Sequence, residues 1–166
     1  MVSKCGKTEF TTILKTNLKQ DLFVFVDYII LHQNPFAVIP ILLYKSKTTH
    51  FAQVHIGVEI NKKIADRAQH YFKKHPDITI LNGDILEVFP EEGSVFFLFN
   101  PFDENYLSSF LERAESSVDH KIKLIYLYPT CREVLDKRNR WKIVKEIQLK
   151  PRHMGALDLC IYEFDV

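Results

Sequence analysis

Polar or acidic side chains follow four successive apolar runs of the sequence, each at the point where the run ends. They are Asp27, Glu59, Asp84 and Asn100. Ligands of open α/β sheets bind at the carboxyl ends of parallel strands, so these positions predict a ligand-binding edge. Each position also has a purely structural interpretation. Asp27 and Asn100 would cap the helices that follow them, and Asp84 would belong to a Gly-Asp turn.

Glu59 carries the most specific of the four signals. A carboxylate at the end of the second strand is placed to accept hydrogen bonds from both hydroxyls of an adenosine ribose, because its two oxygens match a vicinal diol. The alternative is a negative charge that only stabilises the start of the next helix. Position and chemistry together favour an adenosine-containing ligand.

The apolar pattern alternates between strand-like and helix-like segments. Strands are predicted at residues 22–27, 54–60, 78–81, 95–99, 122–128, 141–149 and 157–164. Helices are predicted at residues 10–19, 36–47, 62–75, 105–114 and 131–137, with Asn61 as the N-cap of the third. This alternation indicates an α/β fold, with a mostly parallel seven-stranded sheet and helices on both faces.

The end of the chain adds a constraint on topology. Only a short loop around Pro151 to Gly155 separates the last two predicted strands. A crossover between parallel strands needs about a dozen residues or more, so these two strands are expected to form an antiparallel hairpin. We expect the final strand, at 157–164, to lie antiparallel beside the fifth strand of the sheet.

Three segments resemble the class I S-adenosylmethionine-dependent methyltransferases. GVEINKKIADRA resembles their second motif, ITILNGDILEV their third, and SVFFLFNPFDENYLSSFLERA their fourth-motif strand and the helix after it. The C-terminal hairpin continues the pattern, and the resemblance extends over residues 22–164. It implies one Rossmann-like domain over residues 1–166, with an N-terminal helical segment (1–20) and a core (21–166). It also implies methyltransferase activity with S-adenosylmethionine as the cofactor.

The resemblance implies a role for each cofactor-binding position. Asp27 would close the first strand near the methionine end of the cofactor. Glu59 would hold the ribose, and Ile60 would pack against the adenine. Asp84 would accept a hydrogen bond from the exocyclic amine of the adenine, and Ile85 would flank the ring.

The methyl-acceptor site would be lined by Asn100, Pro101 and Phe102. This segment is similar to the Asn-Pro-Pro-aromatic motif of amine methyltransferases, in which the Asn oxygen and a backbone carbonyl hold the amine. Only one proline is present here, so the acceptor stays open between a small molecule and a protein. A helix-entry turn is the structural alternative for Asn100 and Pro101.

The chain departs from the family at the glycine-rich turn that follows the first strand. No glycine lies between Gly6 and Gly57, and bulky residues, Tyr28 and Ile29, follow Asp27. Glycines at this turn permit positive φ and close approach of the backbone to the ligand. The loss points to a second possibility, a non-catalytic binding or interaction module that keeps the fold. It also disfavours a nicotinamide-dependent dehydrogenase, which needs Gly-x-Gly-x-x-Gly here.

Composition limits which other classes of protein the chain can belong to. The 166 residues are 46% hydrophobic and carry a formal net charge of +1, typical of one globular domain and not of a nucleic-acid-binding protein. The apolar stretch 22–44 contains Asp27, Pro35 and Pro40, which disfavours a membrane span. No signal peptide is expected, and three widely spaced cysteines favour a reducing, cytoplasmic location. No metal is expected, because methyl transfer from a sulfonium needs none.

Overall fold

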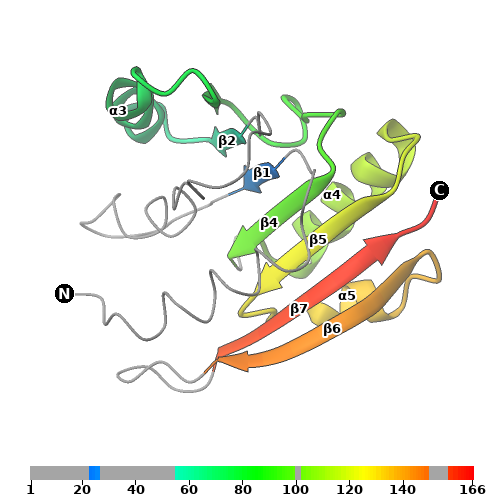
Figure 1. The fold of residues 1–166 in the computed structure, drawn as a ribbon. Coiled ribbons are helices and arrows are strands. Elements are labelled where there is room, and N and C mark those ends of the chain that lie inside the picture. Colours follow the sequence, from blue (N-terminus) through cyan, green and yellow to red (C-terminus); the bar gives the residue numbers. More distant parts are fainter. Residues whose placement is uncertain (1–22, 27–54, 100–101, 150–156) are drawn as a thin grey trace, which may run out of the picture.

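The computed structural model describes residues 23–26, 55–99, 102–149 and 157–166 (Figure 1). Its strands are β1 (Phe23–Val26), β2 (His55–Glu59), β3 (Ile78–Asn82), β4 (Val95–Phe99), β5 (Ile122–Leu127), β6 (Trp141–Leu149) and β7 (Leu157–Phe164). Its helices are α3 (Lys62–Phe72), α4 (Glu104–Ser117) and α5 (Arg132–Asp136). The helices predicted at 10–19 and 36–47 lie outside the described residues.

The seven described strands form one sheet in the order β3-β2-β1-β4-β5-β7-β6. Neighbours from β3 to β5 are parallel, whereas β7 is antiparallel to both β5 and β6. Figure 1 shows β7 lying between β5 and β6. The antiparallel insertion of the last strand beside β5, predicted from the short loop before it, is therefore confirmed.

The end of β5 differs from the prediction by one residue. Strand 122–128 was expected, but β5 ends at Leu127 because Tyr128 takes a left-handed backbone conformation with φ 55°. A side chain with a Cβ rarely adopts this conformation. The N–H of Tyr128 still donates to the carbonyl of Asp158 at 2.8 Å, so the chain turns while it stays attached to β7.

Helix α3 begins where the sequence indicates and ends early. The side chain of Asn61 accepts from the N–H groups of Lys63 and Ile64 at 3.0 and 3.3 Å, which confirms the predicted N-cap. The helix stops at Phe72, not at His75, because a turn follows in which His75 N–H donates to the Phe72 carbonyl. Among the described residues, no helix is long and apolar enough to span a membrane.

Helix α4 is longer at both ends than the predicted 105–114, and α5 is shorter than the predicted 131–137. The side chain of Asp103 accepts from Tyr106 N–H at 2.8 Å and fixes the first turn of α4 at Glu104. At the other end, the N–H of Val118 donates to the carbonyl of Ala114 and closes the last turn. Both caps are local hydrogen bonds that apolar periodicity does not reveal.

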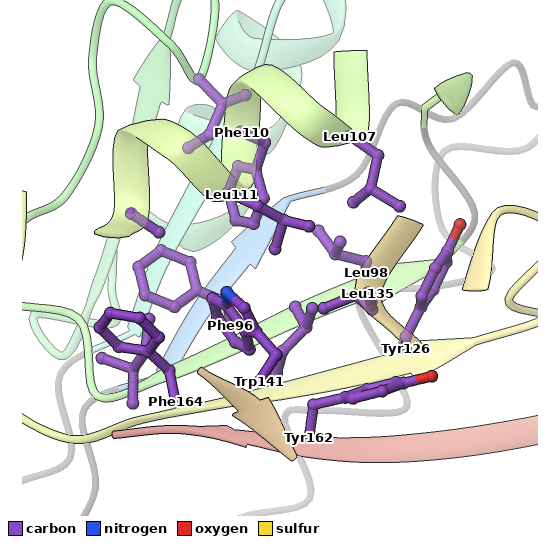
Figure 2. Close-up of a cluster of buried hydrophobic side chains, with 14 of the residues drawn as sticks. Phe96, Leu98, Leu107, Phe110, Leu111, Tyr126, Leu135, Trp141, Tyr162 and Phe164 are labelled. Carbon is purple, nitrogen blue, oxygen red and sulfur yellow. The ribbon is translucent and has the colours of Figure 1, made fainter. Parts of the chain in front are cut away.

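The main core lies between α4 and one face of the sheet (Figure 2). Strand alternation directs Phe96 and Leu98 of β4 toward this face, together with residues of β5 and β7. Leu107, Phe110 and Leu111 recur at helical spacing on α4 and are 0% exposed. Burial of each such side chain stabilises the fold by about 1.5–3 kcal/mol. The core thus fixes α4 against β4 and β5.

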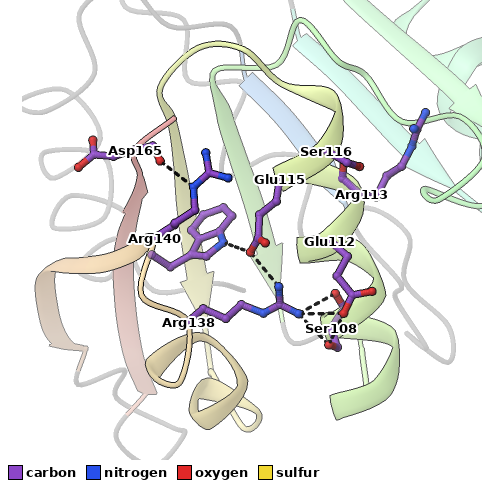
Figure 3. A network of polar contacts seen from close by, with 9 residues as sticks. Ser108, Glu112, Arg113, Glu115, Ser116, Arg138, Arg140 and Asp165 are labelled. Atoms are coloured by element: carbon purple, nitrogen blue, oxygen red, sulfur yellow. Dashed lines mark hydrogen bonds and ion pairs between the residues drawn. The ribbon is translucent and has the colours of Figure 1, made fainter.

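A polar network joins α4 to the start of β6 (Figure 3). The Arg138 guanidinium donates to Glu115 Oε1 at 2.8 Å and to both the carbonyl and the hydroxyl of Ser108. The indole N–H of Trp141 donates to the same Glu115 oxygen at 2.8 Å. One carboxylate therefore serves two donors from the segment after α5, and it holds the C-terminal hairpin to α4.

Candidate functional site

The carboxyl ends of β2 and β3 are joined directly to each other. Glu59 and Asn82 are partners in the parallel register. The side-chain amide of Asn82 donates to the carbonyls of Glu59 at 2.9 Å and Ile60 at 3.2 Å, and Gly83 N–H also donates to the Glu59 carbonyl. Since Asp84 follows Gly83, the two predicted cofactor-binding carboxylates lie at the same edge of the sheet.

Glu59 is a half-buried carboxylate with a single local partner. Its Oε1 accepts from Asn61 N–H at 2.7 Å, and within the described residues its other oxygen takes part in no hydrogen bond. Burial raises the pKa of Glu59 above its usual value, while the bond from Asn61 acts in the opposite direction. A carboxylate with one oxygen available and incomplete solvation is a suitable acceptor for ligand hydroxyls.

Ile60 and Ile85 lie in opposite environments. Ile60, directly after Glu59, is 49% exposed and presents apolar surface at the edge of the sheet. Ile85 is 3% exposed and belongs to the hydrophobic core. The adenine contacts that the sequence suggests for both residues stay predictions. Ile60 has surface available for such a contact, whereas most of the Ile85 side chain is already covered by protein.

Asp84 is held by two donors on one oxygen. Its Oδ1 accepts from Leu86 N–H at 2.9 Å and also from the hydroxyl of Tyr106, on α4. Its backbone carbonyl accepts from Glu87 and Val88 N–H at 2.9 Å each, so the segment after β3 forms a tight turn. The turn interpretation of Asp84 is therefore correct, and it leaves a ligand-binding role possible because Oδ2 is not used by the turn.

Phe102 is the described part of the predicted acceptor motif. Its ring lies 4.7 Å from the ring of Tyr106 and 5.6 Å from that of Phe110, between centroids. Its carbonyl accepts from the Cys131 thiol at 3.7 Å. Asp27, Asn100 and Pro101 lie outside the described residues, as does the glycine-free segment after Asp27. Among the described residues, Glu59 and Asp84 lie at the joined ends of β2 and β3, and Tyr106 links Asp84 to Phe102.

Sequence reasoning missed Tyr106, which contacts both Asp84 and Phe102. The signal was present, because Phe102, Tyr106 and Phe110 recur every four residues across the start of α4. It also missed Tyr128, an exposed side chain with a left-handed backbone at the carboxyl end of β5. Non-glycine residues in this conformation concentrate at functional sites, and only coordinates reveal them.

The described part of the arrangement supplies hydrogen-bond acceptors and apolar surface. Two carboxylates at adjacent strand ends can accept hydrogen bonds from hydroxyl or amine groups, and Ile60 presents exposed apolar surface beside them. The part of the chain that the structure describes contains no group of three His, Cys, Asp or Glu side chains placed to hold a metal. The edge is suited to bind a polar ligand with an aromatic base.

Comparison with known proteins identifies the fold. Neither a model of a protein family nor a curated protein sequence matches the chain. Among solved structures, the tRNA methyltransferase TrmK from B. subtilis has a TM-score of 0.68 at 17% identity, covering 94% of this chain and 65% of that chain. The N-methyltransferase NodS from Bradyrhizobium japonicum WM9 has a TM-score of 0.66 at 12% identity, covering 99% of each chain.

Two further solved structures are similar in fold to this chain. TrmN from Thermus thermophilus has a TM-score of 0.66 at 12% identity, covering 96% of this chain and 49% of that chain. A second structure of NodS is in complex with S-adenosyl-l-homocysteine and has a TM-score of 0.66. The chain therefore has the Rossmann-like fold of the class I S-adenosylmethionine-dependent methyltransferases.

Proposed function

We propose that the protein is an S-adenosylmethionine-dependent methyltransferase with an acceptor still to be identified. The observation that carries the proposal is the position of Glu59 and Asp84 at the adjoining ends of β2 and β3, in a methyltransferase-like fold. A carboxylate at each strand end suits a ligand that presents a diol and an amine on one nucleoside. The structure of NodS in complex with S-adenosyl-l-homocysteine supports the same choice of ligand.

The residues present fit the adenosine part of this cofactor. Glu59 has an unused carboxylate oxygen for the ribose hydroxyls, Ile60 presents apolar surface beside it, and Asp84 has Oδ2 for the adenine amine. When bound, the cofactor supplies a methyl group on an already activated sulfonium. The protein then has to hold donor and acceptor in line and to exclude water.

In the proposed site, Asn100, Pro101 and Phe102 line the acceptor pocket. The acceptor would receive the methyl group on its lone pair, S-adenosylhomocysteine would leave, and the acceptor's proton would pass to solvent. Asn100 and a backbone carbonyl would orient the lone pair by accepting from the acceptor's N–H or O–H groups. A small molecule and a protein side chain are both compatible with this chemistry, and we propose a cytoplasmic location for it.

The second candidate function is a non-catalytic binding or interaction module. The observation that favours it is the absence of glycine between Gly6 and Gly57, where the family's cofactor loop carries glycines. Bulky side chains at that loop would fill space that the methionine part of the cofactor requires. The fold and the edge formed by β2 and β3 would then persist without methyl transfer.

A cofactor titration distinguishes the two functions. An intact site saturated at about 100 times its dissociation constant gains about 2.7 kcal/mol, which raises the melting temperature of a domain of this size by about 5–10 °C. We expect a measurable but smaller rise with S-adenosylhomocysteine, because Tyr28 and Ile29 replace the glycine turn. The measurement is a thermal melt at increasing ligand concentration.

A matched carboxylate change controls this titration. Glu87→Gln removes an exposed carboxylate near Asp84 and is expected to leave the rise unchanged, whereas Glu59→Gln is expected to reduce it. No rise at millimolar ligand would contradict the methyltransferase proposal and support the binding module. A full-sized rise at low micromolar ligand would show that the glycine-free loop does not impair the site.

A further inference from the structure

Tyr106 connects the predicted adenine position to the predicted acceptor position. It lies in the first turn of α4, where its backbone N–H is fixed by the side chain of Asp103 at 2.8 Å. Its hydroxyl donates to Oδ1 of Asp84, which lies 22 residues earlier in the chain. Its ring packs against that of Phe102 in a tilted arrangement, with 4.7 Å between centroids. Backbone, ring and hydroxyl are thus each held in place.

The contacts of Asp84 are distributed unequally between its two oxygens. Leu86 N–H, at 2.9 Å, and the Tyr106 hydroxyl both donate to Oδ1. Within the described ranges, no donor contacts Oδ2. Two donors on one oxygen fix the rotation of the carboxylate about its side-chain bonds, because turning it would break both hydrogen bonds. Oδ2 is therefore kept in one direction as an acceptor.

We propose that Tyr106 is a positioning residue that makes the site selective for a purine bearing an exocyclic amine. The inference rests on the proposed function, since it concerns the base of the same cofactor. By holding Oδ1, Tyr106 fixes Oδ2 where it accepts from the amine of adenine. An ionised carboxylate only accepts, so a purine with a carbonyl oxygen at that position meets an acceptor opposite an acceptor and is rejected.

The conservative variant Tyr106→Phe isolates the hydroxyl. It keeps the ring that packs against Phe102 and removes the hydroxyl that donates to Asp84. The probes are S-adenosylhomocysteine and S-inosylhomocysteine, which differ in carrying an amine or a carbonyl at the same position of the base. The measured quantity is the ratio of their dissociation constants, obtained by calorimetric titration of the full chain.

We expect the unmodified protein to prefer the adenosyl compound by about 10-fold to 100-fold, the range that one lost hydrogen bond to a charged group gives. Tyr106→Phe should lower this ratio at least several-fold, chiefly through weaker binding of the adenosyl compound. Asp84→Ala should abolish the preference. Tyr71→Phe, the same change at a tyrosine of α3 that is 58% exposed, should leave the ratio unchanged.

The outcomes separate this inference from the proposed function. If the unmodified protein binds neither compound, the cofactor proposal fails and the inference fails with it. If it binds the adenosyl compound, but Tyr106→Phe keeps the full ratio while Asp84→Ala loses it, only the inference is overturned. Circular dichroism checks that the variant is folded. Should it be unstable, the ratio is measured in trimethylamine N-oxide, which favours the folded state.

Discussion

Glu59 combines a stabilising local contact with an unfavourable environment for charge. The Asn61 N–H satisfies one oxygen, yet burial raises the pKa of the carboxyl above its usual value. A carboxyl group with a raised pKa binds its proton more tightly in the folded than in the unfolded protein. Its ionisation therefore costs stability as the pH rises, and no such cost exists below the ordinary glutamate pKa. Such a carboxyl is a candidate ligand-binding group.

Glu59→Gln should consequently leave the ligand-free protein at least as stable as the parent at neutral pH. The amide oxygen can still accept from Asn61, and the cost of ionisation is gone. Near pH 4, where the parent carboxyl is largely protonated, the parent and the variant should have the same melting temperature. Thermal melts at the two pH values test this, with Glu87→Gln as the exposed control. A clear loss of stability at neutral pH would show that the Glu59 charge supports the fold.

The same substitution should weaken cofactor binding. Replacing the charged acceptor for the ribose hydroxyls is expected to cost about 1–3 kcal/mol, or roughly 5-fold to 150-fold in the dissociation constant for S-adenosylhomocysteine. Asn100→Ala should leave this constant unchanged, because Asn100 is assigned to the acceptor and not to the donor. Calorimetric titration measures both variants. Equal losses in the two would disprove the division into donor and acceptor roles.

At the scale of elements, α4 is the part that joins the site to the rest of the molecule. Its buried face packs on the sheet, its first turn contacts Asp84, and its later turns bind the segment before β6. The last of these contacts depends on Glu115, which accepts from both Arg138 and Trp141 (Figure 3). Glu115 and Arg138 are 23% and 20% exposed, so their contact is only partly screened by solvent.

Glu115→Ala should therefore destabilise the protein by about 1–3 kcal/mol, because the indole N–H of Trp141 and the Nη1 group of Arg138 lose the acceptor they share. For a domain of this size that lowers the melting temperature by about 2–4 °C per kcal/mol. Glu112→Ala is the matched control, since Glu112 also contacts Arg138 but is 67% exposed, and it should cost less than about 1 kcal/mol. Equal effects in thermal melts would show that the network contributes only through exposed charges.

At the scale of the whole molecule, the sheet order determines which strand ends adjoin. Because β2 pairs with β3 in parallel, the residues after both strands leave the sheet on the same side. Helix α4 follows β4 and packs back over the sheet, which brings its first turn to the segment after β3. The candidate site is therefore assembled from three separate parts of the chain.

Several of these features follow from the sequence alone. Apolar runs of strand length, helical spacing and the Asn61 cap predict the described elements to within a few residues, because each depends on local periodicity and local hydrogen bonds. The short loop before the last strand determined the antiparallel hairpin, since a chain that short cannot cross between parallel strands. The sequence also predicts that Glu59 and Asp84 lie at one edge of the sheet, because the carboxyl ends of parallel strands lie at the same edge.

Only the tertiary structure determined which side chains contact these positions and which of them are buried. The contact from Tyr106 to Asp84, the burial of Ile85 and the thiol contact from Cys131 to Phe102 all depend on how α4 and the segment after β5 pack. The left-handed backbone of Tyr128, whose N–H donates to β7, is likewise seen only in the tertiary structure. Such contacts join residues far apart in the chain, and their geometry is determined by the shape of the packed core. Sequence periodicity reports which face of an element is buried, but not which side chain of another element it meets.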